Sequence, residues 1–210
     1  MQRNFPAFPD RGLYVITRDL EEKRDSLIDE VEAAIRGGAA VVQYRAKEGR
    51  SSVSEARQLL SVCRRFSVPL IINDDVSLAH AIGADGVHLG REDGALRLAR
   101  EVLGTQSIIG VSCYDDLSRA RQAQEAGATY VAFGRFFPSL TKPNAPCARL
   151  ETLSRAKGEI AVPIVAIGGI TLENGGALLE SGAQVLAVIE GVFGAQCPEN
   201  AAAAFRALWD

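Results

Sequence analysis

One short pattern recurs four times along the 210-residue chain and restricts what it can fold into. Each copy is a Gly-Ala pair, one further residue and an apolar segment, and each follows a stretch with helical spacing of apolar residues. The pairs are Gly38-Ala39, Gly83-Ala84, Gly127-Ala128 and Gly182-Ala183. A glycine just past a helix can adopt the left-handed conformation that ends it, and a small alanine allows a tight turn. Each copy therefore predicts a helix, a stop and a buried strand.

Short apolar segments rich in β-branched residues predict eight strands. They span 12–17, 40–45, 69–73, 85–89, 107–112, 129–134, 163–167 and 184–189. The stretches between them carry the 3.6-residue period of helices, and strict alternation of strand and helix indicates a parallel sheet, either open or closed. Eight units in so short a chain favour closure. We expect an α/β fold, a single (β/α)8 TIM barrel over residues 1–210, with 1–11 as an N-terminal extension.

Local signals predict how some of these helices begin. Ser52, followed by Glu55 three residues later, predicts a capping box at the second helix. Either Asp115 or Asp116 can cap the helix after the fifth strand, because both follow it directly.

Charge and composition exclude several classes of protein. The formal net charge is −3 and no basic stripe is present, so nucleic acid and anionic membranes are not expected partners. The first twelve residues lack the apolar core of a signal peptide, and no apolar run approaches the ~18 residues of a membrane helix. Four cysteines lie far apart, which favours reduced thiols in a cytoplasmic protein: Cys63, Cys113, Cys147 and Cys197.

In such barrels the active site lies in the loops at the carboxyl ends of the strands. The second strand runs into Gln43-Tyr44-Arg45-Ala46-Lys47. Strand alternation puts Gln43, Arg45 and Lys47 on one face, and a guanidinium with an ammonium group suits a diphosphate. The alternative for this segment is a solvated basic loop.

Carboxylates follow the next two strands. Asn73-Asp74-Asp75 ends the third strand, and Asp93 comes shortly after the fourth. Because neighbouring strand ends meet at one rim, these oxygen ligands predict a Mg²⁺ site shared with substrate phosphates. The alternative is that Asp75 and Asp93 only cap helices.

Further polar groups follow the later strands. Ser112 could bind a phosphate or cap a helix, and Ser139-Leu140-Thr141-Lys142 is either an anion grip or an ordinary surface loop within the long stretch 135–147. Gly168-Gly169, together with the loop that begins at Glu190, matches the usual phosphate site of these barrels. His88 is interpreted as a packed core histidine.

Taken together, these segments resemble the thiamine-phosphate synthase family from about Gly12 to about Phe193. The matching segments are Gln43–Lys47, Ile72–Asp75, Asp85–Asp93, Gly110–Cys113, Phe133–Lys142 and Ala166–Ile170. The resemblance implies a Mg²⁺-dependent transferase of thiamine biosynthesis. It would join 4-amino-2-methylpyrimidine diphosphate to thiazole phosphate, giving thiamine phosphate and diphosphate. These small molecules are the expected partners, and a homo-oligomer remains open.

The resemblance also implies roles for particular residues. The pyrimidine diphosphate would be bound by Gln43, Tyr44, Arg45, Ala46, Lys47, Asn73, Ser112 and Lys142. The catalytic members of that set would be Arg45, Lys47, Ser112 and Lys142, while Asp74 and Asp93 would hold Mg²⁺. The thiazole phosphate would be bound by Ser139, Leu140, Thr141, Gly169, Ile189 and Glu190.

Three positions depart from the family pattern. Arg135 stands where the family often has Pro, Ser139 where it often has Thr, and Glu190 where it often has Ser. A carboxylate beside a phosphate is unfavourable. We therefore hypothesise either that Glu190 points away and its backbone NH binds, or that Arg135 compensates.

Other functions on the same barrel fit these residues less well. A thiazole-phosphate tautomerase would need a base near the thiazole, and a metal-dependent sugar-phosphate epimerase would need more histidines than the two present. A non-catalytic regulatory barrel should have lost Asp74, Asp93 or Lys142, and all three are retained.

Overall fold

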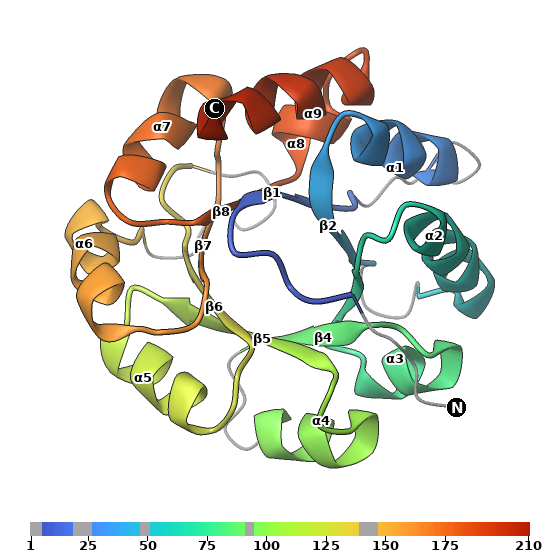
Figure 1. Ribbon diagram of the computed structural model, residues 1–210, viewed down its shortest axis with the longest axis horizontal. Coiled ribbons are helices and arrows are strands. Elements are labelled where there is room, and N and C mark those ends of the chain that lie inside the picture. Colours follow the sequence, from blue (N-terminus) through green and yellow to red (C-terminus); the bar gives the residue numbers. More distant parts are fainter. Residues whose placement is uncertain (1–5, 19–26, 47–50, 91–94, 139–146) are drawn as a thin grey trace.

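The computed structural model describes residues 6–18, 27–46, 51–90, 95–138 and 147–210. Within these ranges, eight parallel strands close into a barrel in sequence order (Figure 1). They are β1 (Gly12–Ile16), β2 (Ala39–Tyr44), β3 (Leu70–Asn73), β4 (Gly86–Leu89), β5 (Ile108–Tyr114), β6 (Tyr130–Gly134), β7 (Ile164–Ile167) and β8 (Val185–Val188). The predicted strands and the TIM barrel are confirmed; β5 alone runs two residues beyond its predicted end.

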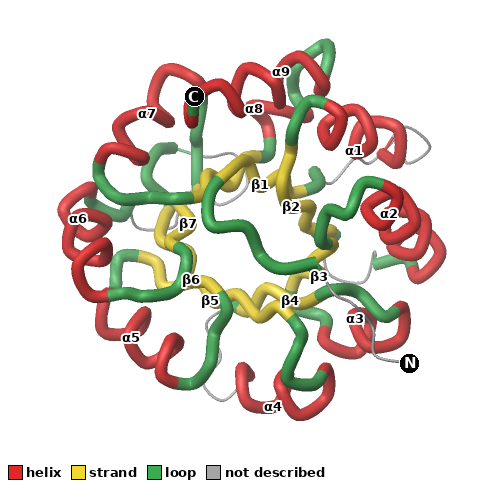
Figure 2. The backbone as a smooth tube through the Cα atoms, viewed as in Figure 1, coloured by secondary structure: helices red, strands yellow, loops and turns green. Residues whose placement is uncertain are grey.

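A ring of helices surrounds the strands (Figure 2). The helices are α1 (Leu27–Arg36), α2 (Val53–Arg65), α3 (Val76–Ile82), α4 (Ala95–Leu103), α5 (Leu117–Glu125), α6 (Leu150–Glu159), α7 (Leu172–Glu180), α8 (Glu190–Phe193), α9 (Pro198–Arg206) and the 3-10 turn η2 (Ala207–Trp209). No described helix is both long and apolar enough to span a membrane.

The glycines of the repeated pattern all have the backbone conformation that their role requires. Gly83 is the left-handed cap of α3 with φ 69°, and Gly38, Gly127 and Gly182 have φ of 106°, 89° and 119°. Such values favour glycine because it has no Cβ to clash with the backbone. The repeat therefore predicted helix ends correctly.

The predicted capping box of α2 is formed only in part. Ser52 Oγ accepts from Glu55 N at 3.3 Å, as predicted. The returning bond is replaced by a bridge through Tyr44, whose hydroxyl accepts from Ser52 N and donates to Glu55 Oε2 at 2.6 Å. At α5 the cap is Asp116, which accepts from Arg119 N. Asp115 instead accepts from Arg149 N, at the start of α6.

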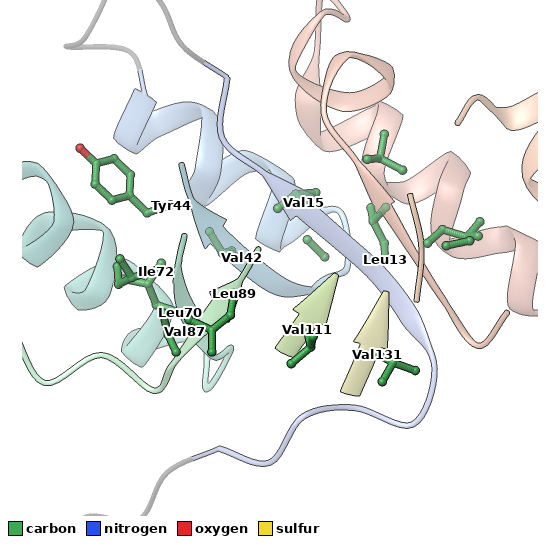
Figure 3. Packing of buried hydrophobic residues seen from close by; sticks show 14 of the residues in the cluster. Leu13, Val15, Val42, Tyr44, Leu70, Ile72, Val87, Leu89, Val111 and Val131 are labelled. Carbon is green, nitrogen blue, oxygen red and sulfur yellow. The ribbon is translucent and has the colours of Figure 1, made fainter. Parts of the chain in front are cut away.

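Strand alternation divides the apolar core into two parts. The outer part lies between barrel and helices, and Figure 3 shows ten of its residues labelled on the strands: Leu13, Val15, Val42, Tyr44, Leu70, Ile72, Val87, Leu89, Val111 and Val131. The inner part fills the barrel with Tyr14, Val41, Ile71, Tyr130, Val165 and their neighbours. The barrel interior is thus a packed core, which leaves the loops as the expected place for ligands.

The segment before β1 covers the end of the barrel at which the strands begin. Figure 2 shows this segment crossing the barrel opening, and Phe8 belongs to the inner cluster. The Phe8 ring stacks on Tyr130 with ring centroids 4.1 Å apart and meets Tyr14 edge-on at 6.1 Å. Part of the expected N-terminal extension is therefore the floor of the barrel.

Candidate active site

The inner faces of the strands carry a chain of hydrogen bonds across the barrel. Gln43 Nε2 donates to the Tyr14 hydroxyl at 2.7 Å, and that hydroxyl lies 2.9 Å from the Tyr130 hydroxyl. Tyr130 lies 2.9 Å from His88 Nδ1, and His88 Nε2 lies 2.8 Å from Ser112 Oγ. The chain connects Gln43 and Ser112, two predicted substrate-binding residues on different strands.

Burial keeps the two tyrosines of this chain uncharged. Burial raises the pKa of Tyr14 above its ordinary value, and hydrogen bonds from Tyr130 and Gln43 offset this only in part. Burial also raises the pKa of Tyr130, as does the neighbouring Tyr14. Both residues therefore act as neutral hydroxyls that donate one hydrogen bond and accept others.

Glycine at position 110 makes room for Tyr130. A Cβ on Gly110 would lie 2.0 Å from Tyr130 Cζ and 2.3 Å from its hydroxyl oxygen. The ring also stacks on Phe8. Packing against Gly110 and against Phe8 therefore restricts the position of the Tyr130 hydroxyl.

The end of β2 is fixed by Thr17, which is completely buried. Thr17 N donates to Gln43 O at 2.9 Å, and Thr17 Oγ1 accepts from Arg45 N at 2.8 Å. The same hydroxyl donates to Arg45 O at 3.1 Å. Gln43 and Arg45 are thus carried by a backbone that is bonded to the end of β1.

Asp74 joins the ends of β3 and β4. It has a positive φ of 59° and donates its backbone N–H to His88 O at 2.8 Å. Its Oδ1 accepts from Gly90 N at 3.1 Å and its Oδ2 accepts from Asn73 Nδ2 at 2.7 Å. The carboxylate is exposed, and each oxygen keeps a further lone pair. Asp75 caps α3 by accepting from Leu78 N, so the alternative reading of Asp75 as a cap is confirmed.

Arg119 on α5 ties this region to β5. Its Nε donates to Ser112 O at 2.9 Å and its terminal nitrogen donates to Gly90 O at 3.0 Å. Because Gly90 also bonds Asp74, one guanidinium holds the backbone around both the candidate metal ligand and the candidate hydroxyl donor. In the described part of the chain, no three His, Cys, Asp or Glu residues are grouped as a metal site.

The loops after β6 and β7 run against each other. Phe136 N donates to Ile167 O and Phe137 N donates to Gly168 O. A Cβ on Gly168 would lie 2.3 Å from Arg135 Cβ, and one on Gly169 would lie 2.3 Å from Pro138 O. Glycine is therefore required at both positions for close contact between the loops, apart from any contact with phosphate.

The side chain of Glu190 turns along its own helix. A Cβ on Gly194, four residues later, would lie 2.9 Å from Glu190 Oε2. The carboxylate therefore extends toward the carboxyl end of α8 and away from the helix start. This geometry favours the first of the two hypotheses for Glu190, in which the side chain points away from a phosphate.

Several other predicted residues have placements that qualify their roles. Tyr44 lies on the outer face of β2, bonded to Glu55, so any contact with substrate would fall to its backbone (Figure 3). Ala46 is partly buried against the outer core, and Ile189 against the inner cluster. Six predicted residues lie outside the described part of the chain: Lys47, Asp93, Ser139, Leu140, Thr141 and Lys142.

Sequence reasoning missed the role of Tyr14, Thr17, Tyr130 and Arg119, and it assigned no partner to His88. His88 is buried, as interpreted, but it bonds both Tyr130 and Ser112. A sequence signal for these bonds existed, because strand alternation puts His88 and Tyr130 on the inner face, where polar atoms need partners.

All four cysteines are free thiols, as expected. Burial raises the pKa of the Cys63 and Cys113 thiols to about 12.

Comparison with known proteins agrees with this architecture. The sequence model of the thiamine monophosphate synthase family matches residues 13–192. A thiamine-phosphate synthase of Methylococcus capsulatus is 53% identical over 190 residues, covering 90% of this chain and 84% of the relative. One of Thiobacillus denitrificans is 49% identical over 209 residues, covering 99% and 97%.

Solved structures agree as well. The thiamine phosphate pyrophosphorylase from Pyrococcus furiosus superposes with a TM-score of 0.82 at 32% identity, covering 95% of each chain. A 3-hexulose-6-phosphate synthase superposes with a TM-score of 0.68 at 18% identity over 93% of this chain and 98% of that one, which shows a shared fold alone. From its sequence match and its relatives, this chain belongs to the thiamine monophosphate synthase family.

Proposed function

We propose that this chain condenses an aminopyrimidine diphosphate with thiazole phosphate, releasing diphosphate and forming thiamine phosphate. The single observation that carries the proposal is the polar arrangement inside the barrel mouth of a member of this family. Gln43 and Ser112 are linked through Tyr14, Tyr130 and His88, while Asp74 is fixed at the adjacent strand ends. This arrangement offers a neutral polar wall for a heterocycle beside an anionic group suited to a metal–diphosphate.

The difficult step is cleavage of the bond between the methylene carbon and the diphosphate oxygen. Negative charge grows on the leaving oxygen, so cations that neutralise it lower the barrier. Arg45 would contribute a guanidinium, with Lys47 and Lys142 as further cations in the proposal. Thr17 supports this role because it bonds both backbone atoms of Arg45 that flank the side chain.

Mg²⁺ belongs to the proposal as the metal that neutralises the diphosphate when bound. Its ligands would be Asp74 and Asp93, with substrate oxygens and water completing the set, which is the donor chemistry that Mg²⁺ prefers. The Asp74 carboxylate suits this role because it is exposed and uses only one lone pair of each oxygen. Gly90, to which it bonds, directly precedes the segment that contains Asp93.

The thiazole nitrogen then attacks the pyrimidine methylene carbon, and no protein nucleophile or general base is required. The thiazole phosphate would be bound by Ser139 to Thr141, Gly169 and the backbone at Ile189 and Glu190. Holding two substrates in line can lower the barrier by roughly 7–11 kcal/mol. Binding and orientation are therefore the main tasks of the protein, which we place in the cytoplasm.

The direct test incubates the purified protein with both substrates and Mg²⁺ and follows thiamine phosphate by fluorescence after oxidation, and diphosphate with a coupled assay. We expect equal amounts of both products, and neither without the metal. Isomerisation of the thiazole phosphate alone would instead indicate a tautomerase. Absence of any reaction, with binding of the pyrimidine diphosphate retained, would indicate a non-catalytic barrel.

A further inference from the structure

We propose that Tyr14, Tyr130 and His88 form a directional relay that couples the amide orientation of Gln43 to the hydrogen-bond direction of Ser112. These three would be positioning residues, since they act through the residues at either end. The relay would make the site select a pyrimidine that donates to Gln43 and accepts from Ser112. This selectivity rests on the proposed function; the relay itself does not.

The direction follows from the orientation of the Gln43 amide together with a count of the protons along the chain of hydrogen bonds. Tyr14 accepts from Gln43 Nε2, so its own proton goes to Tyr130, its other hydroxyl neighbour. Tyr130 then donates to His88 Nδ1, which leaves the imidazole proton on Nε2. That proton is donated to Ser112 Oγ, and the Ser112 proton is left for a ligand.

The opposite direction requires every member to reverse together. If Ser112 donated to His88, Nδ1 would carry the imidazole proton and donate to Tyr130, and Tyr130 would donate to Tyr14. The Tyr14 proton would then need an acceptor, which only a turned Gln43 amide would supply. Mixed directions would leave a buried donor without an acceptor, because Tyr14 and Tyr130 are 1% and 0% exposed.

The packing of Tyr130 prevents it from leaving the chain. Phe8 stacks on one face of the ring, and Gly110 approaches the ring so closely that even a methyl group would collide. The hydroxyl can therefore rotate its proton but cannot move to a new partner. The two ends of the relay respond as a unit.

This direction defines the ligand. With its Nε2 bonded to Tyr14, Gln43 keeps its carbonyl oxygen as an acceptor for an exocyclic amino group. Ser112 supplies a proton to an acceptor such as a diphosphate oxygen or a ring nitrogen. In a pyrimidine with an oxo group in place of the amino group, the oxo oxygen would face the Gln43 carbonyl oxygen, and both are acceptors. Binding such a ligand favourably would require the whole relay to reverse.

The relay can be tested without any substrate, from the tautomer of His88. The chain has two histidines, so ¹⁵N spectra of imidazole-labelled protein contain two pairs of signals, an Nδ1 and an Nε2 resonance for each ring, and His80→Gln identifies the pair that belongs to His88. We expect neutral His88 with its proton on Nε2 in the ligand-free protein, and loss of this single tautomer in Tyr130→Phe. A proton on Nδ1 in the wild-type protein, or an unchanged tautomer in Tyr130→Phe, would overturn the relay.

The selectivity is tested by kcat/KM for the aminopyrimidine diphosphate and for its oxo analogue. We expect Tyr130→Phe and Tyr14→Phe each to reduce the preference for the amino compound at least tenfold, because the Gln43 amide is then free to turn. Ser107→Ala is the matched control, since it also removes a buried hydroxyl, but one bonded to Leu103 O on the connection between α4 and β5.

The outcomes separate the two proposals. A wild-type preference that both Phe variants retain would overturn the selectivity and leave the synthase activity standing. A wild-type protein that forms no thiamine phosphate would overturn the proposed function and, with it, the selectivity, while the ¹⁵N tautomer still decides the relay. If Tyr130→Phe does not fold, the His88 tautomer of the wild-type protein still tests the relay, and kcat/KM of Tyr14→Phe still tests the selectivity.

Discussion

Replacing Gly110 by alanine should disturb the inside of the barrel, because the added methyl group would collide with the Tyr130 ring. The new Cβ would lie 2.0 Å from Tyr130 Cζ, where ordinary contact begins at 3.4 Å. The ring would have to recede by roughly 1.4 Å to restore contact distance. Phe8 stacks on this ring with centroids 4.1 Å apart, so a shift of the ring also disturbs this contact.

The expected cost has two parts. Overpacking a filled core costs about 1–3 kcal/mol. Displacing the ring also stretches the 2.9 Å bonds to Tyr14 and His88, which contribute about 1 kcal/mol each to stability. We therefore expect Gly110→Ala to lower the free energy of unfolding by about 3–5 kcal/mol, a large share of the 5–15 kcal/mol typical of a domain.

Urea denaturation followed by circular dichroism measures this change, with the slope checked for equal exposure of surface in both proteins. Gly158→Ala on α6 is the matched control, because nothing lies within 4 Å of its added Cβ. The control should be neutral or more stable by up to about 1 kcal/mol, since alanine favours helix. A Gly110→Ala protein within about 1 kcal/mol of wild type would refute the packing argument.

Three further predictions concern carboxylates. Asp74→Ala should abolish synthesis or raise the Mg²⁺ requirement at least tenfold in a metal titration; full activity at low Mg²⁺ would remove Asp74 from the metal site. Burial raises the pKa of Asp85, so its charge costs stability as the pH rises, whereas Asp85→Asn keeps an acceptor for Leu70 N. We expect Asp85→Asn to match or exceed wild-type stability in urea at about pH 7, while Asp85→Leu loses about 1–3 kcal/mol; equal losses would contradict this. Burial acts to raise the pKa of Asp115, but hydrogen bonds from Thr152 and Arg149 outweigh it and lower that pKa. The stability from Asp115 is therefore present above its unfolded pKa of about 3.9 and lost as pH falls, so Asp115→Asn should cost about 1 kcal/mol near pH 7 and little near pH 2. An equal loss of stability at both pH values would show that the charge of Asp115 is not the source of this stability.

The fold could be predicted because its signals are local. Glycines with positive φ end the helices at Gly38, Gly83, Gly127 and Gly182, and short apolar runs mark the strands between them. Each signal acts over a few residues, and the repetition of the unit leaves few topologies other than a barrel. Caps that depend only on neighbours, such as Asp75 and Asp116, were predictable for the same reason.

Contacts between distant residues could not be predicted in this way. Tyr14 and Tyr130 are 116 residues apart, and alternation says only that both face inward. Asp115 reaches Arg149, and Tyr44 enters the capping box of α2, because tertiary packing brings them there. The residue types of the candidate site could be predicted from local patterns, whereas the hydrogen-bond chain that connects Gln43 and Ser112 forms only in the closed barrel.

The Phe8 ring makes the two ends of the barrel depend on each other. It approaches from the side where the strands begin, yet it stacks on Tyr130. Tyr130 bonds His88, and His88 bonds Ser112 on β5. A shortened chain beginning at Gly12 would keep every strand and helix that the structure describes and still remove the ring that stacks on Tyr130. Trimming this protein to its regular elements would therefore loosen the proposed substrate-binding surface from the opposite end of the barrel.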